Sequence, residues 1–235
     1  MPKYDIIYIL KEDINPEELR YSLRSIEKNF PHNKVWFIGG QPRGFHPDYA
    51  IKHRQSGETK WDKIRSSMLK AIAQPELTDK FFLFNDDFFV MKPAADPFVN
   101  YAEKTLTWRI EKGREINPWL NHYCRSLYKT REELKSLNYK EINFEVHLPM
   151  LFEKSITAAS ITKCSAPQMR SIYGNVNGIP YEERDDVKIN DLETVPEDAD
   201  YISTTEQIFE KGKVGAFIRA AFPNPCKYEE GNNNG

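Results

Sequence analysis

The sequence predicts an α/β fold built on a mostly parallel, open sheet flanked by helices. Strand-like apolar segments alternate with amphipathic helices over the first 90 residues, which is the pattern of βαβ units. Among the strand-like segments, residues 80–90 form a near-continuous apolar run, which is typical of a strand covered on both faces. The chain has 235 residues, 40% hydrophobic and 13% aromatic, enough for a core. We expect a single domain over 1–235, with a helical insertion at about 100–140 and a flexible tail at 229–235.

The N-terminal βαβ unit has the clearest pattern. Residues 4–10, YDIIYIL, predict a buried strand because they are rich in β-branched and aromatic side chains. The next helix is expected to begin with Asn15 as its N-cap and Pro16 in its first turn. A second strand is expected at 35–38, VWFI. The apolar face of the helix, at the 3.6-residue period, consists of Leu19, Leu23, Ile26 and Phe30.

A third strand and a second helix precede the most apolar run. Residues 50–51 predict a short strand, and Thr59 is expected to cap the helix KWDKIRSSMLKAIAQ. Residues 80–90, KFFLFNDDFFV, predict one continuous central strand.

The second half of the chain is more polar. Residues 108–138 predict one or two helices with loops. Residues 142–147, INFEVH, predict a strand, followed by a short helix over MLFEKS. Ser165 is expected to begin a helix that Gly174 ends, and residues 185–189, DDVKI, predict an edge strand.

Composition excludes several classes of protein. The net charge is −2 and the pI about 6.3, so nucleic acid would have to bind a local basic patch. Three cysteines without a CxxC pair argue against a zinc knuckle or a disulfide framework and favour a reducing compartment. The apolar run at 6–10 is too short for a signal sequence or a membrane span. We therefore expect a cytoplasmic protein with no membrane span.

Two adjacent carboxylates, Asp86 and Asp87, interrupt the apolar run FFLFNDDFFVMKP. Ligands of open α/β sheets bind beyond the carboxyl ends of the strands, where these residues are expected. Because a strand alternates its faces, one carboxylate can face a ligand or metal while the other takes hydrogen bonds from the backbone. Such oxygen-rich sites suit Mg²⁺ or Mn²⁺, which can bridge a diphosphate. The alternative is a solvated turn, which the apolar residues on both sides disfavour.

Two further groups are candidate site residues. Glu145 and His147 share one face of the predicted strand, where they could act as general base and metal ligand. The alternative is an edge strand whose polar residues face water. Lys60 lies at the start of a helix, where backbone N–H groups favour an anion. Surface solvation is the alternative for this lysine.

Three stretches carry a family resemblance. They are the first strand with ELRYSLRSIEKNFP from Glu18, NDDFFVMKP from Asn85, and EVHLPMLFEK from Glu145. Together they resemble the Stealth proteins, sugar-phosphate transferases that build capsules and, in animals, tag lysosomal enzymes. The first strand ends in YILKED, where Stealth proteins have a YTWVDG-like motif. The layout and the stretch STTEQIFEKGKVGAFIRAAFP also resemble phage-encoded GT-A glycosyltransferases, including the Tet-associated group linked to hydroxymethylated bases of phage DNA.

The resemblance implies a GT-A-like, Rossmann-type sheet and a nucleotide-sugar donor, a UDP-sugar, whose diphosphate is held through Mn²⁺ or Mg²⁺. The acidic motif of GT-A enzymes is often D-x-D and here is N-D-D, so either aspartate could be the metal ligand. By position, the metal ligands would be Asp86, Asp87 and His147. The catalytic residues would be Asp87, Glu145 and His147. The donor would contact Leu10, Lys11, Lys60, Asn85 and Asp86.

The expected function is transfer of a sugar from a UDP-sugar to a hydroxyl. The acceptor would be the hydroxymethyl group of a modified base in phage DNA, in the host cytoplasm, or else a saccharide or a lipid-linked acceptor. The alternatives are a Stealth-type sugar-1-phosphate transferase acting on a saccharide and a non-catalytic sugar- or DNA-binding module. Basic groups among aromatic rings suit a nucleic-acid strand, although a solvated helix pair has the same pattern. The basic groups are Arg109, Lys112, Arg114, Arg125, Lys129, Arg131 and Lys135, and the rings are Trp108, Trp119, Tyr123 and Tyr128.

Overall fold

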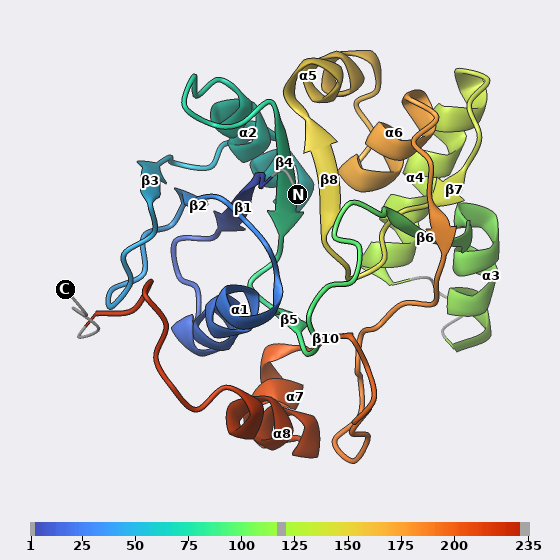
Figure 1. The fold of residues 1–235 in the computed structure, drawn as a ribbon. Helices are drawn as coiled ribbons and strands as arrows, with labels where there is room; N and C mark the ends of the chain where they lie inside the picture. The colour runs from blue at the N-terminus through green and yellow to red at the C-terminus, as the bar shows by residue number, and fades with distance from the viewer. Residues whose placement is uncertain (1–2, 117–120, 231–235) are drawn as a thin grey trace.

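A five-stranded sheet forms the centre of the computed structural model, which describes residues 3–116 and 121–230 (Figure 1). The strand order is β3-β2-β1-β4-β8, with the first four strands parallel and β8 antiparallel at the edge. The predicted α/β class with a mostly parallel sheet is confirmed. The strands are β1 (Asp5–Leu10), β2 (Val35–Gly39), β3 (Tyr49–Lys52), β4 (Lys80–Phe84) and β8 (Met150–Glu153).

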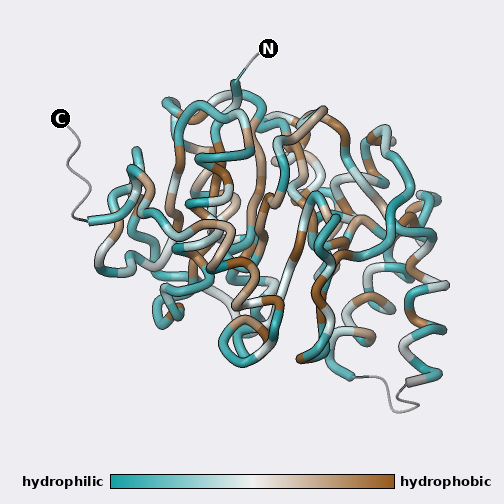
Figure 2. The backbone as a smooth tube through the Cα atoms, turned by 60° about the horizontal axis from the view of Figure 1, so that its bottom comes forward, coloured by the Kyte–Doolittle hydropathy of each residue, from teal (hydrophilic) through white to brown (hydrophobic). Residues whose placement is uncertain are grey.

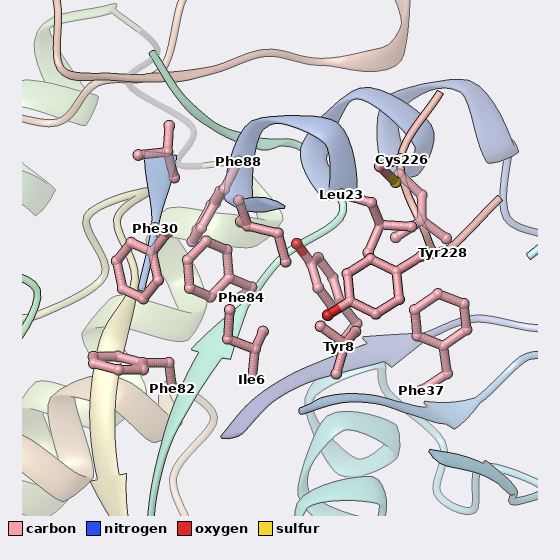
Figure 3. Close-up of a cluster of buried hydrophobic side chains, with 14 of the residues drawn as sticks. Ile6, Tyr8, Leu23, Phe30, Phe37, Phe82, Phe84, Phe88, Cys226 and Tyr228 are labelled. Carbon is pink, nitrogen blue, oxygen red and sulfur yellow. The ribbon is translucent and has the colours of Figure 1, made fainter. Parts of the chain in front are cut away.

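Helices cover both faces of this sheet. On one face, α1 (Pro16–Asn29) packs on alternate strand residues such as Ile6 and Tyr8, in the aromatic cluster of Figure 3. The intervening residues, such as Ile7, face the other side. That face is covered by α2 (Lys60–Ile72), α5 (Lys154–Lys163) and α6 (Met169–Val176). Hydrophobic stretches run through the interior and hydrophilic ones follow the outer loops (Figure 2).

The predicted caps of the first two helices are confirmed. Asn15 Oδ1 accepts a hydrogen bond from the N–H of Glu17 at 3.1 Å. Thr59 forms a capping box with Asp62, in which each side chain accepts from the other residue's backbone N–H. Each cap satisfies N–H groups that have no partner within the helix, so both helices begin where the sequence indicates.

The predicted strand at 80–90 is interrupted at its carboxylates. β4 ends at Phe84, and after a turn β5 (Phe88–Val90) pairs with β10 (Tyr201–Ser203) in a separate two-stranded sheet. On this sheet pack α7 (Glu206–Lys211) and α8 (Lys213–Ala221). The turn therefore places Asn85, Asp86 and Asp87 between two sheets.

The predictions for residues 142–155 are largely wrong. Only β7 (Ile142–Asn143) is strand, and the expected helix at MLFEKS is replaced over its first four residues by β8. β8 buries Phe152 beside Phe81 of β4. A short apolar run does not by itself distinguish a strand from a helix, and here pairing with the distant β4 decides the outcome.

The remaining elements lie beyond the β8 edge of the sheet (Figure 1). They are β6 (Tyr101–Thr105), which pairs with β7 and with β9 (Glu182–Glu183), and the helices α3 (Leu106–Ile116) and α4 (His122–Ser136). Gly174 does not end α6, which continues to Val176. The predicted edge strand at 185–189 is reduced to one bridge between Lys188 and Ser203.

The C-terminal segment packs on α1. Glu229, predicted to lie in a flexible tail, is 4% exposed and pairs with Arg24, whose Nε and Nη2 lie 2.7 and 2.8 Å from its carboxylate oxygens. Arg20 and the N–H of Cys226 also donate to it. The rest of the predicted tail, 231–235, lies outside the described residues. In the described parts of the chain, every helix is too short or too polar to cross a membrane.

Candidate functional site

A cavity of about 820 Å³ opens at the carboxyl ends of β1 and β4. Along the chain, β2 and β3 are added on one side of β1, and β4 is then added on the other side. The order of strand addition therefore reverses between β1 and β4, although the two strands are parallel. Ligands of open α/β sheets bind at such a switch point. The cavity is lined from the β1 end, the segment 54–64, the β4 end, Tyr123 of α4, the loop 145–147 and the start of α6.

The turn after β4 brings Asn85 and Asp86 to the cavity. Asn85 Oδ1 accepts a hydrogen bond from Arg170 Nη2 at 3.1 Å. Burial and the neighbouring charge of Asp87 raise the pKa of Asp86 to about 6. Of the three motif residues, Asp86 thus supplies the carboxylate that faces the cavity.

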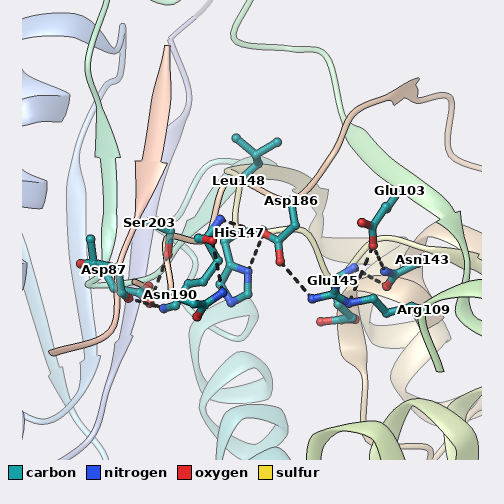
Figure 4. Close-up of polar contacts among 12 residues, drawn as sticks. Asp87, Glu103, Arg109, Asn143, Glu145, His147, Leu148, Asp186, Asn190 and Ser203 are labelled. Atoms are coloured by element: carbon teal, nitrogen blue, oxygen red, sulfur yellow. Dashed lines mark hydrogen bonds and ion pairs between the residues drawn. The ribbon is translucent and has the colours of Figure 1, made fainter. Parts of the chain in front are cut away.

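Asp87, in the same turn between β4 and β5, does not line the cavity. Its Oδ2 forms an ion pair with Lys188 Nζ and lies 3.3 Å from Ser203 Oγ (Figure 4). Lys188 also donates to the carbonyl of Thr204. Asp87 Oδ1 is buried and has no hydrogen-bond partner among the described residues. Asp87, predicted to be catalytic and a metal ligand, is therefore the one motif residue that the structure does not place at the cavity.

His147 lines the cavity and is fixed by Asp186. His147 Nδ1 lies 2.8 Å from Asp186 Oδ1, which also accepts from the His147 backbone N–H at 3.1 Å (Figure 4). Burial would raise the pKa of Asp186, but the hydrogen bonds from His147 and the charge of Arg109, 3.5 Å away, hold it below its ordinary value. With the Nδ1 proton donated to this carboxylate, Nε2 is assigned as a proton acceptor.

Glu145 lies beside the first turn of α6. Its Oε1 accepts from the N–H of Ser171 at 2.9 Å, and burial raises its pKa. Arg170, also buried, donates to the carbonyl of Leu148 at 2.6 Å, and its pKa is lowered by burial to about 10. The hydroxyl of Tyr123 is buried at the cavity without a hydrogen-bond partner in the described parts of the chain.

The opposite wall is cationic. Lys11 follows β1, Arg54 lies between β3 and α2, and Lys60 and Lys63 belong to the first turn of α2. Trp61 of the same turn lines the cavity and stacks on His122, with ring centroids 5.4 Å apart. Glu12 and Asp13 lie on the same rim.

Six of the eight predicted site residues line this one cavity: Lys11, Lys60, Asn85, Asp86, Glu145 and His147. Leu10 does not, because its side chain is buried in the core, and its carbonyl accepts from the N–H of Gly40 and from Gln55. Asp87 is the other exception. Local sequence patterns indicate Asp186, Lys188 and Arg170 only weakly, because their partners are distant in the chain.

The expected set of metal ligands is not brought together. Asp87 is paired with Lys188, and one ring nitrogen of His147 is committed to Asp186. Within residues 3–116 and 121–230, no three His, Cys, Asp or Glu side chains are grouped to hold a metal ion. Asp86 alone does not fit the predicted three-ligand site.

The predicted basic patch is mostly engaged in local contacts. Arg109 lies 3.5 Å from Asp186 and 3.9 Å from Glu103. Arg131 pairs with Glu132, and Lys135 lies 3.9 Å from Glu141. Trp119 lies outside the described residues. Trp108 lies between Lys104 and Lys112, whose ammonium groups are 4.8 and 4.7 Å from its ring centroid.

Comparison with known proteins adds little to this geometry. No protein-family model and no curated protein matches the sequence. Among solved structures, the chain is similar to the glycosyltransferase GlyE of Streptococcus pneumoniae TIGR4, with a TM-score of 0.31 and 11% identity over 54% of this chain. The match covers 42% of the GlyE chain. A likeness at this level carries no argument about fold or function. The fold class is therefore inferred from the sheet of this chain, and any function has to be argued from the cavity.

Proposed function

We propose that this chain is a glycosyltransferase that moves a sugar from a nucleotide-activated donor of the UDP-sugar type to a hydroxyl group. The observation that carries the proposal is a single cavity with two chemically different walls. One wall presents lysine and arginine side chains, and the other presents His147, held by Asp186. A diphosphate leaving group requires positive charge, and an acceptor hydroxyl requires a base.

The lining of the cavity suggests one orientation for the proposed donor. The nucleoside would lie at the end of β1, against Ile9, Ile64 and Trp61, with its diphosphate at Lys11 and Lys60. Asp86 would accept hydrogen bonds from sugar hydroxyls. This orientation directs the anomeric carbon toward the wall that contains His147.

The proposed reaction is a single displacement. His147 Nε2 takes the proton of the acceptor hydroxyl as its oxygen bonds to the anomeric carbon. The bond from that carbon to the phosphate oxygen breaks, and UDP leaves with the electron pair. Asp186 orients the imidazole and stabilises its protonated form. General-base catalysis of this kind contributes about 10²–10⁴-fold, and the displacement inverts the anomeric configuration. No step uses a divalent cation.

The pattern of contacts favours a saccharide as acceptor over hydroxymethylated DNA. Arg109, Arg131 and Lys135, three of the seven cations predicted to contact DNA, lie within 4 Å of carboxylates of this chain. An ion-paired cation has less charge to offer a phosphate backbone. Hydroxymethylated DNA is the second acceptor to be assayed. If DNA is the acceptor, its binding should weaken steeply as the salt concentration rises.

The test is a transfer assay with a UDP-sugar labelled in both the sugar and the β-phosphate. Sugar label in the product with release of UDP supports the proposal, and His147→Asn is expected to abolish it. His46→Asn, which changes an exposed histidine remote from the cavity, is the matched control. Release of UMP with both labels in the product would instead establish sugar-1-phosphate transfer. Donor binding without turnover would establish a binding module.

A further inference from the structure

Two of the three residues in the acidic motif already have cationic partners within the chain. Asn85 accepts from Arg170 at 3.1 Å, and Asp87 pairs with Lys188. The Asp87 and Lys188 side chains are 17% and 14% exposed, so solvent and salt screen this pair little. A cation that took Asp87 Oδ2 as a ligand would therefore have to displace an ammonium group from a largely buried position, and Asp87 Oδ1 is buried away from the cavity lining.

Lys188 is held in place by its backbone as well as by its charge. Its N–H lies 3.3 Å from Asp186 Oδ1, and its residue bridges to Ser203 beside β5. Its ammonium group donates to the carbonyl of Thr204 in addition to Asp87. Displacement of this ammonium group would leave it without either partner in a poorly hydrated place, which is strongly unfavourable.

The facing wall supplies positive charge of its own. Lys11, Arg54, Lys60 and Lys63 are exposed at the cavity. In the described parts of the chain, none of the four lies within 4.0 Å of a carboxylate as an ion pair. Glu12 and Asp13 line the same rim, so four cations against two carboxylates leave this wall a formal net charge of +2.

We propose that the cavity binds a diphosphate without a divalent cation, with Lys11, Arg54, Lys60 and Lys63 neutralising the phosphate oxygens. Lys188 takes the place beside Asp87 that the predicted metal would have occupied. The proposal rests on the proposed function for the identity of the ligand as a sugar nucleotide. It replaces the expected Mn²⁺ or Mg²⁺ with charges that the chain itself provides.

The experiment measures binding of two probes, UDP and inorganic pyrophosphate, by titration calorimetry in EDTA and in MnCl₂. We expect each Kd to differ by less than about threefold between the two conditions, because the ligand's charge is met by side chains. The double variant Lys11→Met/Lys60→Met is expected to weaken binding at least about tenfold in EDTA. Lys70→Met, an exposed lysine of α2 outside the cavity, is the matched control and should bind as the wild type does.

A second readout follows the metal directly. Electron paramagnetic resonance of Mn²⁺ in the absence of UDP should give the same signal with and without the protein, because the described residues form no three-ligand site for the ion. Binding that requires Mn²⁺ and is lost in Asp86→Asn would overturn the inference and restore the predicted metal site. Metal-free binding of pyrophosphate with no preference for UDP would support diphosphate binding by the four cations. The same result would count against a nucleotide-sugar as the donor. If neither probe binds in either condition, both the inference and the proposed function are refuted.

Discussion

Glu18 is a buried carboxylate on the first turn of α1, close to the acidic motif. It is 6% exposed, and its Oε1 accepts a hydrogen bond from Thr204 Oγ1 at 2.9 Å. Burial, opposed by this hydrogen bond and reinforced by the charges of Asp87 and Asp86, raises its pKa from 4.5 to about 7. Glu18→Gln keeps an oxygen for Thr204 and removes the ionisable group.

The sign of the effect follows from the direction of the pKa change. Below about pH 4.5 the carboxyl is protonated in both the folded and the unfolded chain, so its ionisation has no effect on stability. As the pH rises from 4.5 to 7 the unfolded chain ionises first, and the free energy of unfolding falls. At about 1.4 kcal/mol for each unit of pKa, the full loss above pH 7 is about 3 kcal/mol.

Urea denaturation of both proteins between pH 4.5 and pH 8 measures this effect. Glu18→Gln is expected to match the wild type at pH 4.5 and to be more stable by about 3 kcal/mol at pH 8. Glu17→Gln, the exposed neighbour that pairs with Arg20, is the control and should change stability by less than about 1 kcal/mol. A difference between wild type and Glu18→Gln that does not vary with pH, or a loss of stability at pH 8, would refute the reasoning.

Three further predictions concern stability and catalysis. Glu229→Gln is expected to cost about 3 kcal/mol at pH 7, because its arginine partners lower the Glu229 pKa to about 2 against the effect of burial. This cost should shrink as the pH falls below 4.5, and urea denaturation that shows an equal cost at pH 3 would contradict it. Gly174→Ala is expected to lower stability by about 1–3 kcal/mol, because a Cβ would lie 2.4 Å from the Phe144 ring, and an unchanged Tm would contradict this. Asp186→Asn is expected to reduce kcat about 10²-fold or more and to alter the pH–rate profile, because an amide favours the wrong tautomer of His147. If only KM changes, Asp186 does not act through the base.

Sequence-local signals predicted the first half of the fold well. The caps at Asn15 and Thr59 and the apolar periodicity of α1 depend on residues a few positions apart, so they can be read without tertiary information. β8 could not be predicted in this way, because an edge strand forms only if its partner lies beside it. Its pairing with β4 joins segments about 70 residues apart.

The candidate site shows the same division. Asp86 can be predicted from its own surroundings in the sequence, since polar groups at strand ends indicate a ligand. His147 was predicted from the alternation of a strand that in the structure ends at Asn143. Their neighbours were not, because His147 is separated from Asp186 by 39 residues and Asp87 from Lys188 by 101. A carboxylate that faces a ligand and one that faces a lysine look alike in the sequence. The two can be told apart only by the group that contacts the carboxylate, and that contact is known only from the folded structure.

The contact between α1 and the C-terminal segment has a consequence for how the chain reaches its folded state. Arg24 and Glu229 are 205 residues apart. At about 5–20 residues per second, a ribosome would need roughly 10–40 s to make Glu229 after Arg24. During that interval α1 can pack on the sheet while Arg24 lacks its carboxylate partner and Arg20 has only Glu17 of the same helix. The last step of folding would therefore be a long-range closure, of the kind that slows folding most.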